Sequence, residues 1–418
     1  MYRNIIRFSC LLLSAAGLFA QGSFFLKSGD TVVFYGDSIT DQRLYTTFAE
    51  TYAVTRFPNL DLKFVHSGWG GDRVSGGGGG PIDVRLTRDV YPYRPTVMTI
   101  MLGMNDGRYR TFDQELFDTY AAGVKSIVKN VKSTIPGIRI MLIEPSPYDD
   151  VTRPPLFTDG YNAVLVRYGK FLRELARLES LSTADLNFSV VEELGKANTI
   201  DPEGAKKLLP DRIHPGAGGH LLMAKALLKA WNAPATVTVV EIDTASGIAA
   251  RSENTNVTGL QIESAISWDQ ADKALLMPLD MKDAGVALAV RSSDVIQALN
   301  QELLRVGPLP AMRYRLKIDG EDLGVFTKEQ LSDGINLAVL PSTPMLKQAA
   351  EVHAITLRHN NIHFVRWRQV QVPLEPALAH KQAAMDALDA LDSDLIQQQH
   401  AAAQPKPHHY ELTPEGAQ

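Results

Sequence analysis

The feature that most constrains the fold is a regular alternation of short apolar runs and longer amphipathic stretches between Thr31 and about Trp231. The apolar runs are Thr31–Tyr35, Leu62–His66, Val97–Leu102 and Ile138–Ile143, with a weaker one near Leu181–Leu186. They are near-continuous in hydrophobicity, as expected for strands that are buried on both faces. Helix-like stretches such as Phe112–Val131 and Tyr161–Leu178 separate them, and Ala217–Ala230 follows the last run. The alternation predicts an α/β domain in which helices cover both faces of a doubly wound parallel sheet.

Beyond this domain the hydrophobic pattern of the sequence changes. The segment Asn232-Ala233-Pro234-Ala235 ends the last helix candidate, and short alternating runs such as Thr236–Ile242 and Tyr314–Ile318 follow it. The pair Asp319-Gly320 is typical of a hairpin turn. We therefore expect a smaller β-rich unit and then a helical region that leads into a polar tail. The predicted division is a signal segment over 1–22, the α/β domain over 23–232, a β-rich accessory unit over 233–330, a helical extension over 331–403 and a disordered tail over 404–418.

The N-terminal segment has the pattern of a secretory signal peptide. Arg3 and Arg7 give a positive start, and an apolar stretch from Phe8 to Ala20 ends in small residues. The stretch is too short to span a bilayer comfortably, since a spanning helix needs about 20 apolar residues. A buried helix or an uncleaved anchor is the alternative. We expect a secreted or periplasmic protein with no transmembrane segment after signal removal.

Cysteine content, charge and histidine spacing exclude several partners and sites. The only cysteine lies inside the signal segment, so the mature chain can form no disulfide and no thiolate metal site. The formal net charge of -5 gives no basic field for nucleic acid. His353, His359 and His363 have a spacing that suits no standard metal site, with no acidic residue between them. We expect packing or surface histidines, and neither a metal nor another cofactor.

Polar residues follow the predicted strands at the edge where a parallel sheet binds its ligands. Ser38 comes directly after the first strand, and Asn105 follows the third. A serine hydroxyl is a poor nucleophile unless a base removes its proton, and His214 is the natural base. Asp211 lies three residues before His214 and can reach its far ring nitrogen. The Asn105 amide and the backbone N–H groups of Gly71 and Ser38 could stabilise an oxyanion.

The same residues resemble four sequence blocks of a known family. Gly36-Asp37-Ser38, Gly71-Asp72, Gly103-x-Asn105-Asp106 and Asp211-x-x-His214 are similar to the blocks of SGNH (GDSL-type) hydrolases. The resemblance covers about residues 24–232 and implies a flavodoxin-like three-layer α/β/α catalytic domain. It implies Ser38 as the nucleophile, His214 as the base, Asp211 as its orienting acid, and Ser38, Gly71 and Asn105 as the oxyanion hole. The first block is GDSIT rather than GDSL, and His66-Ser67 stands where Asn-Ala is frequent.

Several neighbouring side chains are candidate substrate contacts. Asp37, Trp69, Arg73 and Asp106 lie within or beside the four blocks, where each could instead pack locally. Five consecutive glycines, Gly76–Gly80, follow the second block. They lack the Gly-Lys-Ser/Thr ending of a phosphate loop, so we expect a mobile loop beside the acyl site.

Together these features predict an exported serine ester hydrolase that acts through an acyl-serine intermediate. Our first expectation for its partner is a small-molecule or polysaccharide ester, with acetyl groups removed from carbohydrate. A lysophospholipase or thioesterase is the alternative enzyme, and a glycan-binding protein on a dead hydrolase scaffold is the alternative of another class. Residues 235–372 resemble an extension of some exported members of the family. That extension could bind sugars or only cover the catalytic domain; Trp268 and Trp367 are the only tryptophans there.

Overall fold

The computed structural model describes residues 23–374 and 378–416, and its first domain is built on one parallel sheet. All neighbouring strands in this sheet run parallel, in the order β2-β1-β5-β6-β7. Their bounds are β2 Leu62–Gly68, β1 Asp30–Gly36, β5 Val97–Met101, β6 Arg139–Ile143 and β7 Ser182–Ala184. The strands are almost entirely buried, which explains their continuous hydrophobicity. The predicted parallel sheet is confirmed, and its weakest apolar run gives the shortest of its strands.

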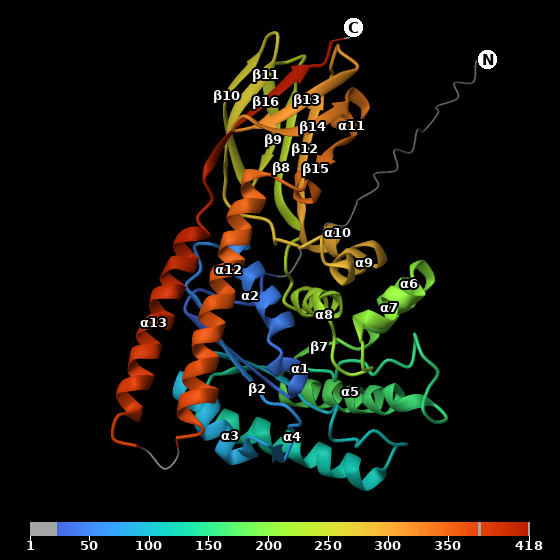
Figure 1. Cartoon of the computed structure of the whole chain (residues 1–418), viewed down its shortest axis with the longest axis vertical. Helices are drawn as coiled ribbons and strands as arrows, with labels where there is room; N and C mark the ends of the chain where they lie inside the picture. The colour runs from blue at the N-terminus through green and yellow to red at the C-terminus, as the bar shows by residue number, and fades with distance from the viewer. Residues whose placement is uncertain (1–22, 375–377, 417–418) are drawn as a thin grey trace, which may run out of the picture.

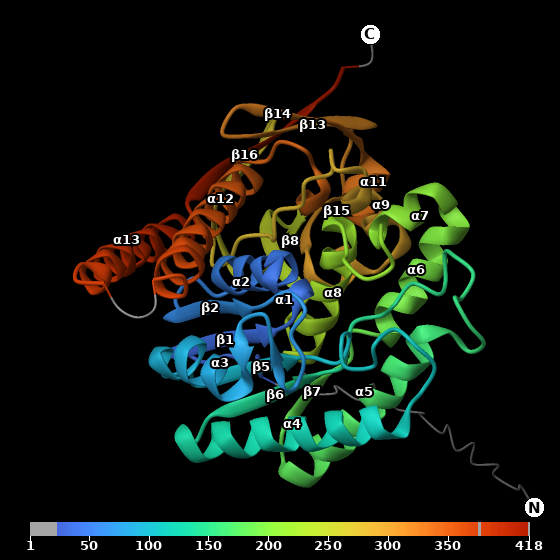
Figure 2. The same cartoon turned by 60° about the horizontal axis from the view of Figure 1, so that its bottom comes forward.

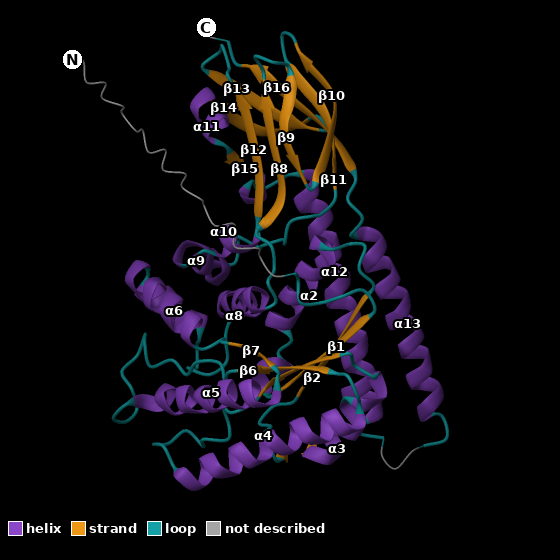
Figure 3. Ribbon diagram, turned by 180° about the vertical axis from the view of Figure 1, so that it is seen from behind, coloured by secondary structure: helices purple, strands orange, loops and turns teal. Residues whose placement is uncertain are grey.

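Helices lie on both sides of this sheet, which gives three layers (Figures 1 and 3). One side carries α1 (Ser38–Asp41), α2 (Leu44–Arg56) and α8 (Ala217–Ala230); the other carries α3 (Ile82–Asp89), α4 (Gln114–Thr134) and α5 (Gly160–Glu179). Two further helices, α6 (Phe188–Ile200) and α7 (Pro202–Leu208), complete the domain, with a short hairpin of β3 (Gly76–Gly77) and β4 (Gly80–Pro81) and the 3-10 turn η1 (Tyr91–Tyr93). The α/β/α architecture is as expected.

The β-rich unit consists of two sheets that share one core. The sheets have the orders β10-β11-β16-β13-β14 and β15-β12-β8-β9. Trp268 and Tyr410, stacked 5.0 Å apart, lie at the centre of this core. The strands are β8 Thr236–Asp243, β9 Ile248–Glu253, β10 Thr255–Ile262, β11 Ile266–Asp272, β12 Gln301–Gly307, β13 Arg313–Ile318, β14 Glu321–Thr327, β15 Ile335–Asn336 and β16 Pro407–Pro414. Between β14 and the next long helix lie α11 (Lys328–Asp333) and the 3-10 turn η2 (Leu337–Val339).

Two parts of the structure differ from the expected boundaries. Residues 407–414 form β16, between β11 and β13, where the sequence suggested a disordered tail. The polar composition of this segment obscured an alternation of buried and accessible side chains with a period of two. His408, Tyr410 and Leu412 point inward, and the residues between them are exposed or half-buried. Residues 284–299 form α9 (Ala284–Ser292) and α10 (Val295–Leu299), which pack on α8 and share the core of the α/β domain rather than that of the β-rich unit.

The helical extension connects the two units. Helix α12 (Pro344–Phe364) begins beside the β-rich unit, runs down along α2, and continues into the π-helical segment η3 (Val365–Gln371). Helix α13 (Lys381–Ala402) returns beside it (Figure 2). None of the helices among the described residues is long and apolar enough to cross a bilayer. The expected export signal lies outside the described residues and stays a prediction.

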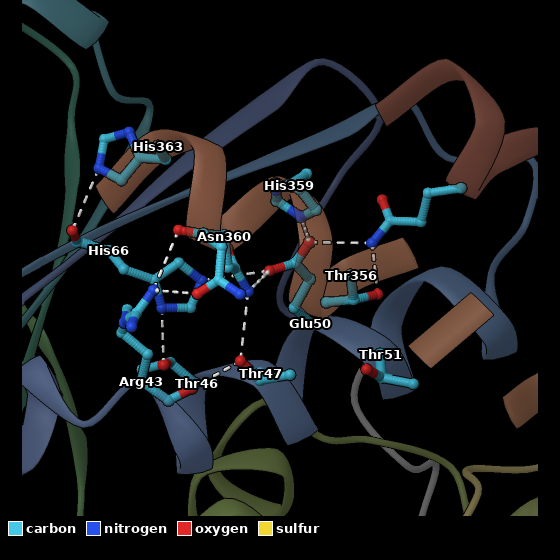
Figure 4. Close-up of polar contacts among 12 residues, drawn as sticks. Arg43, Thr46, Thr47, Glu50, Thr51, His66, Thr356, His359, Asn360 and His363 are labelled. Carbon is cyan, nitrogen blue, oxygen red and sulfur yellow. Dashed lines mark hydrogen bonds and ion pairs between the residues drawn. The ribbon is translucent and has the colours of Figure 1, made fainter. Parts of the chain in front are cut away.

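A buried polar cluster holds the extension to the α/β domain (Figure 4). Glu50 on α2 accepts hydrogen bonds from His359 on α12, from His66 on β2 at 3.2 Å and from Gln399 on α13 at 3.0 Å. Asp392 lies 3.4 Å from the other nitrogen of His359. Burial alone would raise the pKa of Glu50, but His359 and His66 outweigh it and hold that pKa well below its usual range. Burial would lower the pKa of His359, but Glu50 and Asp392 raise it to about 10.

The other two histidines of the metal candidate have partners of their own. His353 lies 2.9 Å from the hydroxyl of Thr51, and the Nε2 of His363 lies 3.2 Å from the backbone oxygen of His66. All three histidines therefore pack between α12 and the α/β domain, each with a different protein partner. Within the part of the chain that the structure describes, no three metal-ligating side chains gather into a site.

We predict that Glu50→Gln destabilises the protein by about 3–5 kcal/mol, because it leaves a buried imidazolium without its carboxylate. Chemical denaturation at pH 6 would measure the loss. The matched control is Glu174→Gln, which removes an exposed ion pair with Arg177 and should cost under about 1 kcal/mol. Equal effects of the two substitutions would contradict a stabilising role for the cluster.

The same pair makes the effect depend on pH. Because its folded pKa is raised, His359 contributes fully below its ordinary 6.5, and its contribution is lost as the pH rises toward about 10. Because the folded pKa of Glu50 is lowered, its contribution is present above its ordinary 4.5 and is lost on acidification. The difference in free energy of unfolding between wild type and Glu50→Gln should thus be largest between pH 4.5 and 6.5. It should become smaller at higher pH.

Candidate active site

Ser38 lies at the carboxyl edge of the sheet, where β1 passes directly into α1. Asp37 caps this short helix, and its carboxylate accepts a hydrogen bond from the Ile39 N–H at 3.1 Å. Ser38 is the first residue of the helix and is half-buried. The strand and the cap thus fix the backbone on both sides of the serine, so that its hydroxyl lies at the edge predicted for ligands.

Ser38, His214 and Asp211 form one continuous hydrogen-bonded chain. The Oγ of Ser38 lies 2.8 Å from the Nε2 of His214, and the Nδ1 of His214 lies 2.7 Å from the Oδ2 of Asp211. The Oδ1 of Asp211 accepts from the backbone N–H groups of His214 and Ile213 at 2.7 and 3.0 Å. Partial burial would raise the pKa of Asp211, but these hydrogen bonds outweigh it and keep the pKa below its usual range. A carboxylate held in this way fixes the ring with Nδ1 protonated and Nε2 free to accept the serine proton.

Gly71 and Asn105 lie on the loops that follow β2 and β5. Gly71 has a φ of +77°, which a residue with a side chain rarely adopts, and no atom lies within 4 Å of where its Cβ would be. The amide nitrogen of Asn105 donates to the backbone oxygen of Asp72 at 3.1 Å, and its oxygen accepts from the Tyr109 hydroxyl at 2.7 Å. Since a carbonyl only accepts, these contacts fix which end of the amide faces Asp72 and leave one N–H for a ligand.

Tyr109 lies outside the four sequence blocks but contacts Asn105 directly. Both Arg108 and Tyr109 have a φ of 54°, an unfavourable backbone conformation for residues of this size. The surrounding structure maintains it, and it brings the Tyr109 hydroxyl to Asn105. Strained backbone of this kind is concentrated at functional sites.

Two of the four predicted substrate contacts are buried. Asp37 and Asp106 are only 1% and 7% exposed. The first caps α1, and the second accepts from the Val74 N–H at 3.0 Å. Burial raises the pKa of Asp37 to about 7 and that of Asp106 to about 6. Both side chains hold the backbone of the loops in which they lie, and contact of either with a substrate stays a prediction.

The other two candidates, Trp69 and Arg73, are accessible to different degrees. Trp69 is half-buried, and the guanidinium of Arg368 stacks on its ring at 3.6 Å. Arg73 is exposed, and its Nε donates to the backbone oxygen of Asn105 at 3.3 Å. Of the four, Arg73 is the most accessible, so it is best placed to meet a substrate.

The run of five glycines, where we expected a mobile loop, forms a tight hairpin. β3 and β4 pair within it, and Gly79 lies flat against the indole of Trp69. A Cβ on Gly79 would lie 2.6 Å from both the Trp69 ring and the Arg85 side chain. Glycine is therefore required there by the close approach of the backbone to the loop that carries Gly71.

Two residues of this region gave no signal in the sequence. Asp41 accepts from the Gly70 N–H at 3.2 Å, and Arg368 contacts Asp41 from the helical extension. The two residues are 327 positions apart, and neither belongs to a motif. Only the packing of η3 against the α/β domain brings them together.

Comparisons with known proteins agree with this geometry. Residues 34–222 match the model of the GDSL-like lipase/acylhydrolase family. The chain is 26% identical to an acetylxylan esterase of Geobacillus stearothermophilus over 229 residues, which are 49% of this chain and 94% of that protein. It is also similar in structure to a gut microbial diltiazem-metabolizing enzyme, with a TM-score of 0.80 and 25% identity, over 94% of this chain and all of the other. That likeness includes the β-rich unit and the helical extension, which the family match does not reach.

Proposed function

Since this chain belongs to the GDSL-like lipase/acylhydrolase family and is a carboxylic ester hydrolase, we propose that Ser38 is its nucleophile and that it removes acetyl groups from carbohydrate. The observation that carries the assignment of the nucleophile is the unbroken hydrogen-bonded chain from Ser38 through His214 to Asp211. It joins a hydroxyl, a base and an orienting carboxylate in the order that acyl transfer requires.

The proposed reaction has two steps that share the same groups. The Ser38 oxygen attacks the acyl carbon while its proton passes to the Nε2 of His214, and Asp211 stabilises the cation that forms. His214 then gives this proton to the leaving alcohol, and an acyl-serine remains. In the second step His214 takes a proton from water, whose oxygen attacks the acyl carbon. The acid leaves, and the proton returns to Ser38.

The oxyanion of each step would lie between Gly71 and Asn105. The Gly71 N–H and the Ser38 N–H make no hydrogen bond with other described residues, and the Asn105 amide keeps one N–H free. Donors that already point at the developing charge need no reorganisation during the reaction. No metal enters these steps, because the serine is activated by its base.

The preference for acetyl esters rests on the relatives. The 26% identical protein is an acetylxylan esterase, and its similarity covers 49% of this chain and 94% of that protein. The protein that is similar over nearly the whole chain acts on diltiazem, a compound that carries an acetate ester. In the β-rich unit Trp268 is fully buried in the core, so it offers no face for stacking on a sugar. We therefore expect the β-rich unit to shape or support the site rather than to bind glycan through that residue.

A panel of esters tests this proposal. We expect kcat/KM to be highest for p-nitrophenyl acetate and to fall with acyl chains of four, eight and twelve carbons. Acetate release from acetylated xylo-oligosaccharides and from diltiazem then distinguishes carbohydrate from apolar alcohols as the leaving group. A preference for long chains would instead indicate a lipid hydrolase, and an inactive wild type on every ester would remove the proposal.

A further inference from the structure

The π-helical segment η3 of the C-terminal extension lies against the loop that carries Gly71, and a chain of buried side chains links it to Asn105. We infer that this extension completes the hydrolase site, with Arg368 and Trp367 as positioning residues for the oxyanion hole. The inference rests on the proposed function of Gly71 and Asn105. It assigns a role to residues 365–371, which lie outside the family match of 34–222.

Arg368 holds the loop that contains Gly71 from one side. Its guanidinium stacks on the Trp69 ring at 3.6 Å, and its Nη1 lies 3.2 Å from the Oδ1 of Asp41. The other oxygen of Asp41 accepts from the Gly70 N–H at 3.2 Å, directly before Gly71. A planar guanidinium can stack and pair at the same time, which an ammonium cannot do. Arg368 thereby fixes the backbone that aims the Gly71 N–H.

A chain of buried charged side chains links Trp367 to the loops that carry Gly71 and Asn105. Its Nε1 donates to the Oδ1 of Asp89 at 2.6 Å, and Asp89 pairs with Arg85. The Nε of Arg85 donates to the Oδ2 of Asp72 at 2.7 Å. The backbone oxygen of Asp72 in turn accepts from the Asn105 amide, so this chain ends at the second proposed oxyanion donor.

The buried position of this chain makes it sensitive to the loss of one member. The side chains of Arg85, Asp72 and Asp89 are fully buried in their ion pairs. The Arg85 guanidinium also lies over the rings of Trp69 and Trp367, at 5.3 and 5.6 Å. Removal of one hydrogen bond inside such a network leaves a buried polar atom unpaired, and its neighbours must shift. The shift would reach Asp72 and hence the Asn105 amide.

A π-helical turn at this place is consistent with the inference. The segment Val365–Gln371 continues α12 without a break but with the wider winding that often marks functional sites. It places Trp367 beside Asp89, and Arg368 beside the Trp69 ring and Asp41. The contact between His359 and Glu50, about two turns earlier, fixes the position of α12 along the α/β domain.

The test compares Arg368→Ala and Trp367→Phe with Arg366→Ala in the full chain. Arg366 belongs to the same segment but pairs with Asp389 on α13, away from the loops, so its loss should leave activity unchanged. For p-nitrophenyl acetate we expect kcat and kcat/KM of Arg368→Ala to fall together by about 10- to 100-fold, with KM little changed. Trp367→Phe keeps the ring but loses the N–H to Asp89, and should show a fall in the same sense. Arg368→Lys should recover part of the loss, since it keeps a cation beside Asp41.

A second measurement separates positioning from general stability. Phenylboronic acid forms a tetrahedral adduct with a nucleophilic serine, so its affinity depends on the oxyanion donors. We expect its Kd to rise in Arg368→Ala by about the same factor as kcat/KM falls, while thermal unfolding changes no more than in Arg366→Ala. Wild-type kcat and boronate affinity in a folded Arg368→Ala would overturn the inference. If Arg368→Ala does not fold, Asp41→Asn makes the same test, with a fall in kcat expected and no change overturning it. An inactive wild type would instead overturn the proposed function.

Discussion

Ser38→Ala is expected to lower kcat for p-nitrophenyl acetate by roughly 10⁵- to 10⁶-fold, the scale seen when a serine hydrolase loses its nucleophile. The variant keeps the oxyanion donors and His214, so a small residual activity over water should remain. No acyl-enzyme can form, and the burst of p-nitrophenol that precedes the steady state should disappear with it.

The structure offers a matched control for this substitution. Ser75 is exposed and lies four residues after Gly71, and Ser75→Ala should retain wild-type kinetics. Removal of the Ser38 hydroxyl does not touch the Asp37 cap, so we expect the same unfolding midpoint for both variants. An active Ser38→Ala would show that a different group attacks the ester, whatever the fate of the control.

Asp211→Asn is expected to lower kcat by about 10³- to 10⁴-fold through the tautomer of His214. An asparagine oxygen can still accept from the His214 and Ile213 backbone, so the loop should keep its shape. Its NH₂ group would then face the Nδ1 of His214, which must accept rather than donate. The ring proton moves to Nε2, and the base can no longer take a proton from Ser38.

Asp201→Asn is the control for this effect on the backbone. Asp201 caps α7 by accepting from the Gly204 N–H at 2.9 Å, a contact of the same kind as that of Asp211 but remote from the site. We expect unchanged kinetics for it. Because the Asp211 side chain is 54% exposed, water could stand in for it in Asp211→Ala, so that variant should lose less activity than Asp211→Asn. Wild-type turnover in Asp211→Asn would exclude Asp211 as the orienting acid.

The α/β domain could be predicted from the sequence because the features that define it are local. Each buried strand is one continuous apolar run, and the polar residue after it must lie at the same edge as the others. Ser38, Asn105 and His214 could therefore be brought together without knowledge of any contact between them. Chemistry then paired them, since a serine needs a base and a base needs an orienting carboxylate.

The other features of the site and fold could not be predicted, because they depend on packing between segments that are far apart in the sequence. Asp37 and Asp106 stand in the same motifs as Ser38 and Asn105, and a motif alone does not distinguish a residue that caps a loop from one that touches a substrate. Arg368 has no pattern around it and acquires its role only when η3 lies on the loops. β16 was missed because its alternation is short and its apolar positions include a histidine, His408.

The Glu50 cluster also determines the order in which the parts of this protein can mature during synthesis. Every strand of the parallel sheet lies within residues 30–184, so the sheet can form early as the chain emerges. Glu50 is then in place on α2, but its partner His359 lies 309 residues further along. Until α12 has left the ribosome, Glu50 has His66 as a partner but lacks His359, and the face of α2 and β2 that α12 will cover stays open to water. A nascent hydrolase domain therefore has one of its buried carboxylates only partly paired, and translation of the extension completes that cluster.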